Sequence, residues 1–170
     1  MKSWLLVQFV GLKVLGLFLV FGMHWYFLGW MTFLTGGLFV DAHHFLPRSQ
    51  GLCDVVTGFT PSGRELWLTI DDGPDPVDTP EILDLLDAHG AKATFFMIGS
   101  KAQKYPELVR AVVARGHTIG NHTYSHPLKD FWCAGRKRVQ RELDDSLEVL
   151  KRAGADVHFF RSPVGIKPCF

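Results

Sequence analysis

The sequence predicts an α/β protein with a parallel sheet, preceded by an N-terminal transmembrane helix. Residues 14–40 contain no Asp, Glu, Lys or Arg, whereas from Leu66 onward short apolar segments alternate with amphipathic ones. Alternating strands and helices joined by right-handed crossovers produce a parallel sheet. We therefore expect three parts: a membrane anchor at residues 1–40, a linker at 41–64 and an α/β domain at 65–170.

The uncharged run is longer than the about 20 apolar residues that a helix needs to cross a bilayer. It contains aromatic side chains that favour the headgroup boundary, namely Trp25, Tyr26 and Trp30. Lys2 and Lys13 precede the run and favour a cytoplasmic N-terminus, although Arg48 on the far side weakens this bias. No A-x-A-like site follows, which disfavours a cleaved signal peptide. The chain is thus expected to be a single-pass membrane protein with its α/β domain on the extracytoplasmic side.

The linker at residues 41–64 has no sustained periodicity and carries several Pro and Gly residues. A net charge of +1 over 170 residues gives no reason to expect a nucleic-acid partner. The three cysteines form no CxxC pair, so neither a zinc ribbon nor a redox motif is predicted.

Within the α/β domain, apolar runs predict four strands, at residues 67–70, 92–98, 117–120 and 157–160. Three amphipathic segments predict helices. The first starts with Asp78 or Thr79 as its cap and stops at Gly90, the second runs from Pro106 to Gly116, and the third passes through residues 139–150 to Gly154.

Adjacent carboxylates, Asp71 and Asp72, follow the first strand and precede a Gly-Pro turn signal. Acids at such a position often do no more than cap their own turn. His122 and His126 lie four residues apart in HTYSH, and on a helical turn this spacing places both imidazoles on one face. With one carboxylate they would make a ligand set that suits a catalytic zinc, and equally non-haem iron.

The last cluster is FFRSPVG, in which Arg161 follows the fourth strand. An arginine at a strand end is usually a solvated charge. Beside a catalytic carboxylate it would instead hold the acid ionised and oriented.

Together, DDGPDP, HTYSH and RSPVG resemble the motifs of polysaccharide deacetylases of the NodB-homology type, carbohydrate esterase family 4. The resemblance runs from about Leu66 to Gly165. It implies that Asp71 is the catalytic base and that Arg161 steadies it. It also implies a divalent metal ion, zinc, bound by three ligands: Asp72, His122 and His126.

The resemblance further implies a distorted (β/α) barrel of about seven or eight strands. Four strands are predicted here, so the expected domain is an incomplete barrel. Two later family motifs have no counterpart within these residues: an Asp/Trp motif, and a Leu-x-His motif whose histidine serves as general acid. We therefore expect any activity to be impaired by truncation.

The expected function is metal-dependent hydrolysis of N-acetyl or O-acetyl groups on a polysaccharide. The expected partners are the acetylated polysaccharide and the membrane, with no nucleic acid and no defined protein partner. One alternative is a non-catalytic, membrane-anchored fragment with a vestigial metal site. Another is a non-haem iron oxygenase, but the DDGPDP and RSPVG segments have no role in that chemistry.

Overall fold

The computed structural model describes residues 2–168, which fall into two compact units. The first unit comprises Met1–Phe59 with Ile166–Phe170, and the second comprises Thr60–Gly165. Cys53 and Cys133 are free and exposed, while Cys169 lies outside the described residues. The predicted divisions at residues 40 and 64 remain predictions.

The first unit contains two helices, α1 (Ser3–Phe21) and α2 (Tyr26–Phe45), joined by a short turn. The expectation of one helix through the uncharged run was therefore wrong. The chain reverses direction in the turn, where Gly22 caps α1 and His24 has a positive φ of 56°. Hydropathy reports the polarity of this run but carries no signal for such a reversal. Of the described helices, only α1 passes a length-and-composition test for a membrane span, a test that signal sequences also pass.

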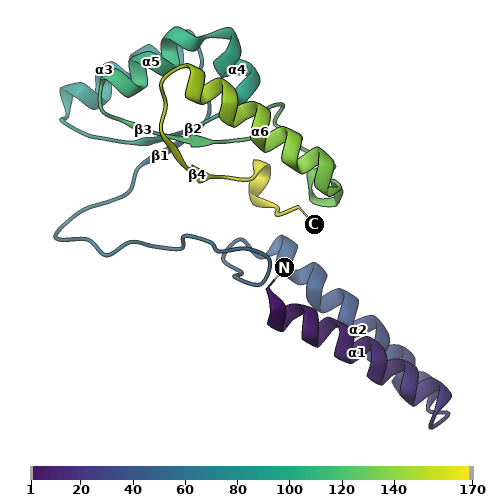
Figure 1. The fold of residues 1–170 in the computed structure, drawn as a ribbon. Coiled ribbons are helices and arrows are strands. Elements are labelled where there is room, and N and C mark those ends of the chain that lie inside the picture. The colour runs from purple at the N-terminus through teal and green to yellow at the C-terminus, as the bar shows by residue number, and fades with distance from the viewer. Residues whose placement is uncertain (1, 169–170) are drawn as a thin grey trace. The chain divides into compact units, whose positions relative to one another are not determined.

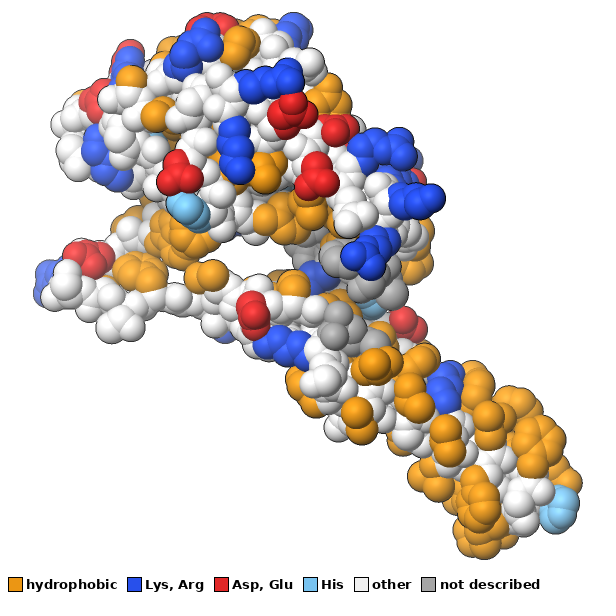
Figure 2. Space-filling model, in the orientation of Figure 1, with side chains coloured by type: hydrophobic (Ala, Val, Ile, Leu, Met, Phe, Trp, Pro, Cys, Tyr) orange, Lys and Arg blue, Asp and Glu red, His pale blue; other side chains and the backbone are white. Residues whose placement is uncertain are grey.

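The two helices pack closely as an antiparallel hairpin. A Cβ atom on Gly16 would lie 2.8 Å from the carbonyl oxygen of Gly29, and one on Gly29 would lie 2.6 Å from a methyl group of Val20. Only glycine permits this approach. The Lys13 ammonium group lies 3.8 Å from the centre of the Phe33 ring, a cation–π contact within the pair. Figure 2 shows hydrophobic side chains over most of the visible face of the hairpin.

The second unit is built on a four-stranded sheet with the strands in the order β1-β2-β3-β4. The strands are β1 (Thr69–Gly73), β2 (Thr94–Met97), β3 (Thr118–Asn121) and β4 (Val157–Phe160). All neighbouring pairs are parallel, as predicted. Their carboxyl ends therefore meet at one edge of the sheet.

Four helices cover one face of this sheet (Figure 1). They are α3 (Asp78–Ala88), α4 (Gly99–Lys104), α5 (Pro106–Ala114) and α6 (Arg136–Arg152). The sequence predicted α3, α5 and α6, but α4 is too short for its periodicity to be recognised. Short 3₁₀ turns lie at Phe131–Cys133 and Pro163–Gly165.

The start of α3 differs from the expectation that Asp78 or Thr79 caps it. Asp75 performs this task, because its side chain accepts hydrogen bonds from the backbone N–H groups of Val77 and Asp78 at 2.8 and 3.1 Å. These two bonds lower the pKa of the Asp75 carboxyl. The Thr79 hydroxyl instead accepts a hydrogen bond from the Asp75 N–H.

Strand side chains alternate between the two faces of the sheet. Phe95 and Met97 belong to the buried core between the sheet and the helices. Phe96 points to the opposite face, on which Trp67 and Phe159 also meet at 5.3 Å between ring centroids. The Phe96 ring lies near His122 and carries the Arg161 guanidinium, so this second face leads to the candidate site.

Candidate active site and metal centre

The end of β1 presents the two adjacent carboxylates through a bulge. Asp71 pairs with Phe96 and Gly73 with Met97, which leaves Asp72 as an extra residue in the register. Successive side chains of a regular strand point to opposite faces, and a bulge changes this alternation. Asp72 has a φ of 68°, a conformation that Asp tolerates better than most residues. The Lys101 ammonium group donates to the carbonyl oxygen of Asp72 at 2.8 Å and ties the bulge to α4.

The two histidines follow β3 on a loop. The helical turn that their spacing had suggested does not form. Gly120 and Asn121 are the last residues of β3, so the strand ends one residue later than the predicted strand at residues 117–120. The reversal after the strand depends on positive φ angles at Thr123 (67°) and His126 (53°). The two imidazole centroids lie 4.9 Å apart as a result.

Asp72, His122 and His126 converge at this edge of the sheet. One Asp72 carboxylate oxygen lies 3.3 Å from Nε2 of His122 and 3.1 Å from Nε2 of His126. One donor atom from each of the three residues lies within 4.8 Å of the others, so together they could hold a metal ion. This arrangement matches the three ligands that the sequence predicted. Their role as metal ligands remains a prediction.

His122 is suited to donate a lone pair. Its Nδ1–H donates to the backbone carbonyl of Arg161 at 2.7 Å, which leaves Nε2 as the unprotonated nitrogen facing Asp72. Burial lowers the pKa of His122, although the bond to Arg161 partly offsets this effect. Both features favour the neutral imidazole that metal binding requires, so the donor set fits a divalent cation.

Asp71 lies beside this donor set and is held by Arg161. The guanidinium Nη1 donates to Asp71 at 2.7 Å and to the Thr69 hydroxyl at 3.0 Å. The guanidinium carbon also lies 4.2 Å from the centre of the Phe96 ring. A carboxylate in this position has a fixed orientation and a permanent positive partner.

Sequence reasoning missed several residues that build the site: Thr69, Phe96, Lys101 and Glu142. Thr69 and Phe96 look like ordinary strand residues, because alternation alone cannot tell which face carries the site. Lys101 and Glu142 lie on helices and contact only backbone or loop atoms of the site. No local pattern marks such contacts.

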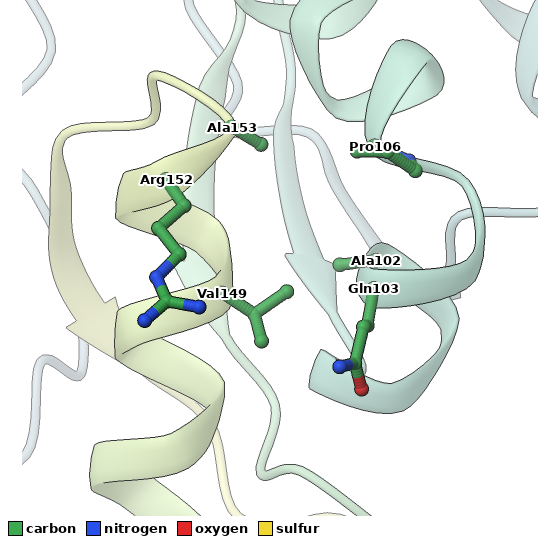
Figure 3. A pocket seen from close by; sticks show the side chains of 6 residues that line it. All are labelled: Ala102, Gln103, Pro106, Val149, Arg152 and Ala153. Atoms are coloured by element: carbon green, nitrogen blue, oxygen red, sulfur yellow. The ribbon is translucent and has the colours of Figure 1, made fainter.

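The hollow in Figure 3 lies elsewhere, between α4, the start of α5 and α6. Its volume is about 150 Å³, and none of the candidate site residues lines it. Arg152 at its rim pairs with Glu148 on the same helix. The candidate chemistry therefore lies at the carboxyl ends of the strands, where parallel α/β folds place their sites.

Comparisons with known proteins agree with this arrangement. The polysaccharide deacetylase family model matches residues 59–168. A chitooligosaccharide deacetylase of Sinorhizobium fredii is 45% identical over 103 residues, which is 59% of this chain and 47% of that protein. A peptidoglycan-N-acetylglucosamine deacetylase of Bacillus cereus is 44% identical over 102 residues, 59% of this chain and 36% of that protein.

Solved structures give the same result. A family 4 carbohydrate esterase from Streptomyces lividans, in complex with acetate, is 34% identical with a TM-score of 0.56 and aligns over 60% of this chain and 52% of its own. The chain thus spans about half or less of the length of the proteins it resembles. The match extends over more than half of the chain and contains every residue of the convergent site, and the chain therefore belongs to the polysaccharide deacetylase family.

Proposed function

We propose that the chain catalyses metal-assisted hydrolysis of acetyl groups on a polysaccharide. Zinc is the proposed metal, because two neutral imidazoles and one carboxylate leave an open position on a tetrahedral ion. The proposed substrate class is a polymer of N-acetylated sugars, which the names of the two relatives above, chitooligosaccharide and peptidoglycan deacetylases, support.

The observation that carries this proposal is the placement of Asp71. This carboxylate lies next to the donor set yet takes no part in it, and Arg161 holds it at 2.7 Å. A base that is separate from the metal ligands is what hydrolysis of an amide or ester requires, because a proton must leave the attacking water.

Each residue then has a definite task. When bound, the metal ion supplies a Lewis acid that polarises the acetyl carbonyl and makes water a better nucleophile. Asp71 accepts the proton of that water and returns it to the departing nitrogen or oxygen, and Arg161 keeps the carboxylate directed toward the water. The Asp71 and Asp72 side chains are 37% and 60% exposed, so a sugar polymer can reach them.

The test is acetate release from a chitooligosaccharide by the purified chain, with zinc and after chelation. We expect zinc-dependent release that falls about 10²- to 10⁴-fold in Asp71→Asn, with zinc affinity preserved. Asp78→Asn, which changes an exposed carboxylate at the start of α3, is the matched control and should behave as the parent. Equal release from the parent and Asp71→Asn would rule out this assignment of the base.

We also propose that the four parallel strands form part of a distorted (β/α) barrel. The support is their sequential order, the helices on one face and the site at the carboxyl ends of the strands. A structure of the protein encoded by the whole open reading frame would test this, and an open sheet in that structure would contradict the barrel.

The N-terminal helix α1 is proposed to anchor the protein in a membrane as a single span, with the deacetylase unit on the extracytoplasmic side. α1 has 19 residues, a length that matches a bilayer core of about 30 Å at about 1.5 Å per residue, and α2 packs against it. The hydroxyls of Thr32 and Thr35 bond to carbonyls within α2 and need no water. Carbonate extraction should leave the chain in the membrane pellet, and recovery in the soluble fraction would contradict anchoring.

A further inference from the structure

The loop that carries the two histidines is held from outside by the start of α4 and by one acidic side chain of α6. The backbone N–H groups of Gly99 and Ser100 donate to the carbonyls of Thr123 and Tyr124, both at 2.9 Å. One carboxylate oxygen of Glu142 accepts the backbone N–H groups of Tyr124 and Ser125, at 3.0 and 2.8 Å. Its other oxygen accepts the Ser125 hydroxyl at 2.5 Å. The two bonded residues lie between His122 and His126, so Glu142 fixes the middle of the segment that separates the two imidazoles.

The next residue of the same helix makes a second attachment. The backbone carbonyl of Leu143 accepts the Asn121 side-chain amide at 3.0 Å. The amide oxygen of Asn121 in turn accepts the Thr123 N–H at 2.8 Å. Two consecutive residues of α6 thus hold the loop, one at its start and one at its centre.

The loop needs such support because its backbone is strained. Thr123 and His126 both have positive φ angles, and for a β-branched residue such as Thr this conformation is costly. The hydrogen bond from the His126 N–H to the Thr123 hydroxyl, at 3.2 Å, is the support that the loop supplies for itself. A strained segment keeps a single conformation only when its surroundings impose it.

We propose that Glu142 is a positioning residue that sets the separation of His122 and His126 and thereby the affinity of the site for its metal. It touches neither the donor atoms nor Asp71, and acts through the backbone of Tyr124 and Ser125. The proposal rests on the proposed function only in taking Asp72, His122 and His126 as the metal ligands.

The test measures Zn²⁺ affinity of the full-length chain in detergent, by competition with a chromophoric chelator. Glu142→Ala should lower the affinity about 10- to 100-fold, the loss typical of residues that orient metal ligands. Glu142→Gln should recover most of it, because an amide oxygen can still accept both N–H groups. Glu148→Ala is the matched control on the exposed side of α6, where Glu148 pairs with Arg152 of the same helix, and it should bind as the parent does.

Hydrogen exchange of the metal-free chain gives a second readout that does not depend on metal. The peptide containing Tyr124 and Ser125 should exchange faster in Glu142→Ala than in the parent, while peptides from β2 and α5 stay unchanged. If all peptides of Glu142→Ala exchange fast, that variant has lost its fold, and Glu142→Asp is measured in its place. The shorter Asp side chain keeps the charge but is too short to accept the N–H groups of Tyr124 and Ser125.

Parental zinc affinity and parental exchange in both Glu142→Ala and Glu142→Asp would overturn the proposal. A loss of affinity in Glu148→Ala equal to that in Glu142→Ala would also overturn it, because the effect would then belong to the charge of the helix. A parent chain that binds no zinc would contradict the proposed function, whereas the exchange comparison would still decide the role of Glu142.

Discussion

Asp71 and Asp72 are neighbours in sequence but have different partners. Asp72 faces two imidazole nitrogens, while Asp71 receives a guanidinium hydrogen bond. The bulge at Asp72 makes this separation possible, because a regular strand would direct only one of the two toward the site. A single-residue insertion or deletion at this point would therefore exchange or remove both roles.

The sequence identified all five side chains that meet here, and their spacing correctly suggested that the histidines share one location. It could not predict how they meet. A left-handed residue at Thr123 and a bulge at Asp72 are local conformations that neither composition nor periodicity encodes. The supporting contacts of Arg161 with Thr69 and Phe96 join residues that are far apart in the chain, so no local pattern reveals them.

His117 provides a prediction of pH-dependent stability. Its Nδ1 accepts the Ala93 N–H at 3.3 Å, and its Nε2 is buried with no hydrogen-bond partner among the described residues. Burial lowers the pKa of His117, and the cations Lys92 and Arg115 add to this while Asp87 opposes it. Protonation would also break the bond to Ala93.

The unfolded chain then binds this proton more readily than the folded chain does. The contribution of His117 to the free energy of unfolding is therefore fully present above the ordinary histidine pKa of about 6.5, and it declines as the pH falls below that value. We expect the Tm of the metal-free chain to fall between pH 7 and pH 5, and to fall less in His117→Asn, measured by thermal scanning. Parallel curves for the parent and the variant would contradict this.

At the scale of the elements, β2 and β3 pack so closely that one glycine controls the position of the arginine. A Cβ atom on Gly120 would lie 2.5 Å from two carbons of the Phe96 ring and 3.3 Å from the carbonyl oxygen of Phe159. The same ring supports Arg161 at 4.2 Å. A methyl group added to β3 would thus displace the Phe96 ring, and the displaced ring would move the arginine that holds Asp71.

We expect Gly120→Ala to destabilise the unit by about 1–3 kcal/mol, the usual cost of overpacking. It should also lower deacetylation without removing zinc binding, since the three atoms nearest the added methyl belong to Phe96 and Phe159 and to none of the donor residues. Denaturant unfolding and acetate release measure the two effects. Gly58→Ala, at a position where a Cβ meets nothing within 4 Å, is the control. A Gly120→Ala chain with parental stability would show that Phe96 has room to move.

Elements with a strong period were predicted well, and elements that depend on context were not. β4 was predicted at its observed residues, and α6 was found from apolar residues at helical spacing. The cap of α3 was misplaced because Asp75, whose side chain accepts the first backbone N–H groups, lies before the helix, whereas Asp78 and Thr79 are its first two residues. α4 has only six residues, fewer than two turns, so it offers no periodicity to detect.

At the scale of the whole molecule, the N-terminal hairpin is the feature that hydropathy concealed. Its uncharged run contained a reversal, and the packing of Gly16 against Gly29 lies within that run. A hydropathy profile averages over about 19 residues, so a four-residue turn made of weakly polar residues disappears in it. Figure 2 shows the charged side chains concentrated on the deacetylase unit and few on the helices.

The hairpin can be tested by a disulfide. A Cβ atom on Gly36 would lie 3.2 Å from the Cβ of Leu12, close to the separation of about 3.5–4.5 Å found in disulfides. We expect Leu12→Cys with Gly36→Cys to cross-link within one chain in isolated membranes, counted as loss of maleimide-reactive thiols. The native cysteines are first replaced by Ser: Cys53, Cys133 and Cys169. Leu12→Cys with Gly37→Cys, whose Cβ meets no atom of Leu12 within 4 Å, should stay reduced.

The antiparallel hairpin also bears on compartment. A chain that crosses a bilayer once ends on the face opposite its start, whereas a chain that crosses twice returns to the face it left. Paired insertion of α1 and α2 would give an even number of crossings, so an epitope before Lys2 and the deacetylase unit would share one compartment. The extracytoplasmic placement inferred from Lys2 and Lys13 therefore requires that α1 alone crosses, and because Lys13 lies within α1, only Lys2 precedes that span. The test is protease accessibility of that epitope and of the unit in intact cells. Equal accessibility indicates two crossings, and different accessibility indicates one.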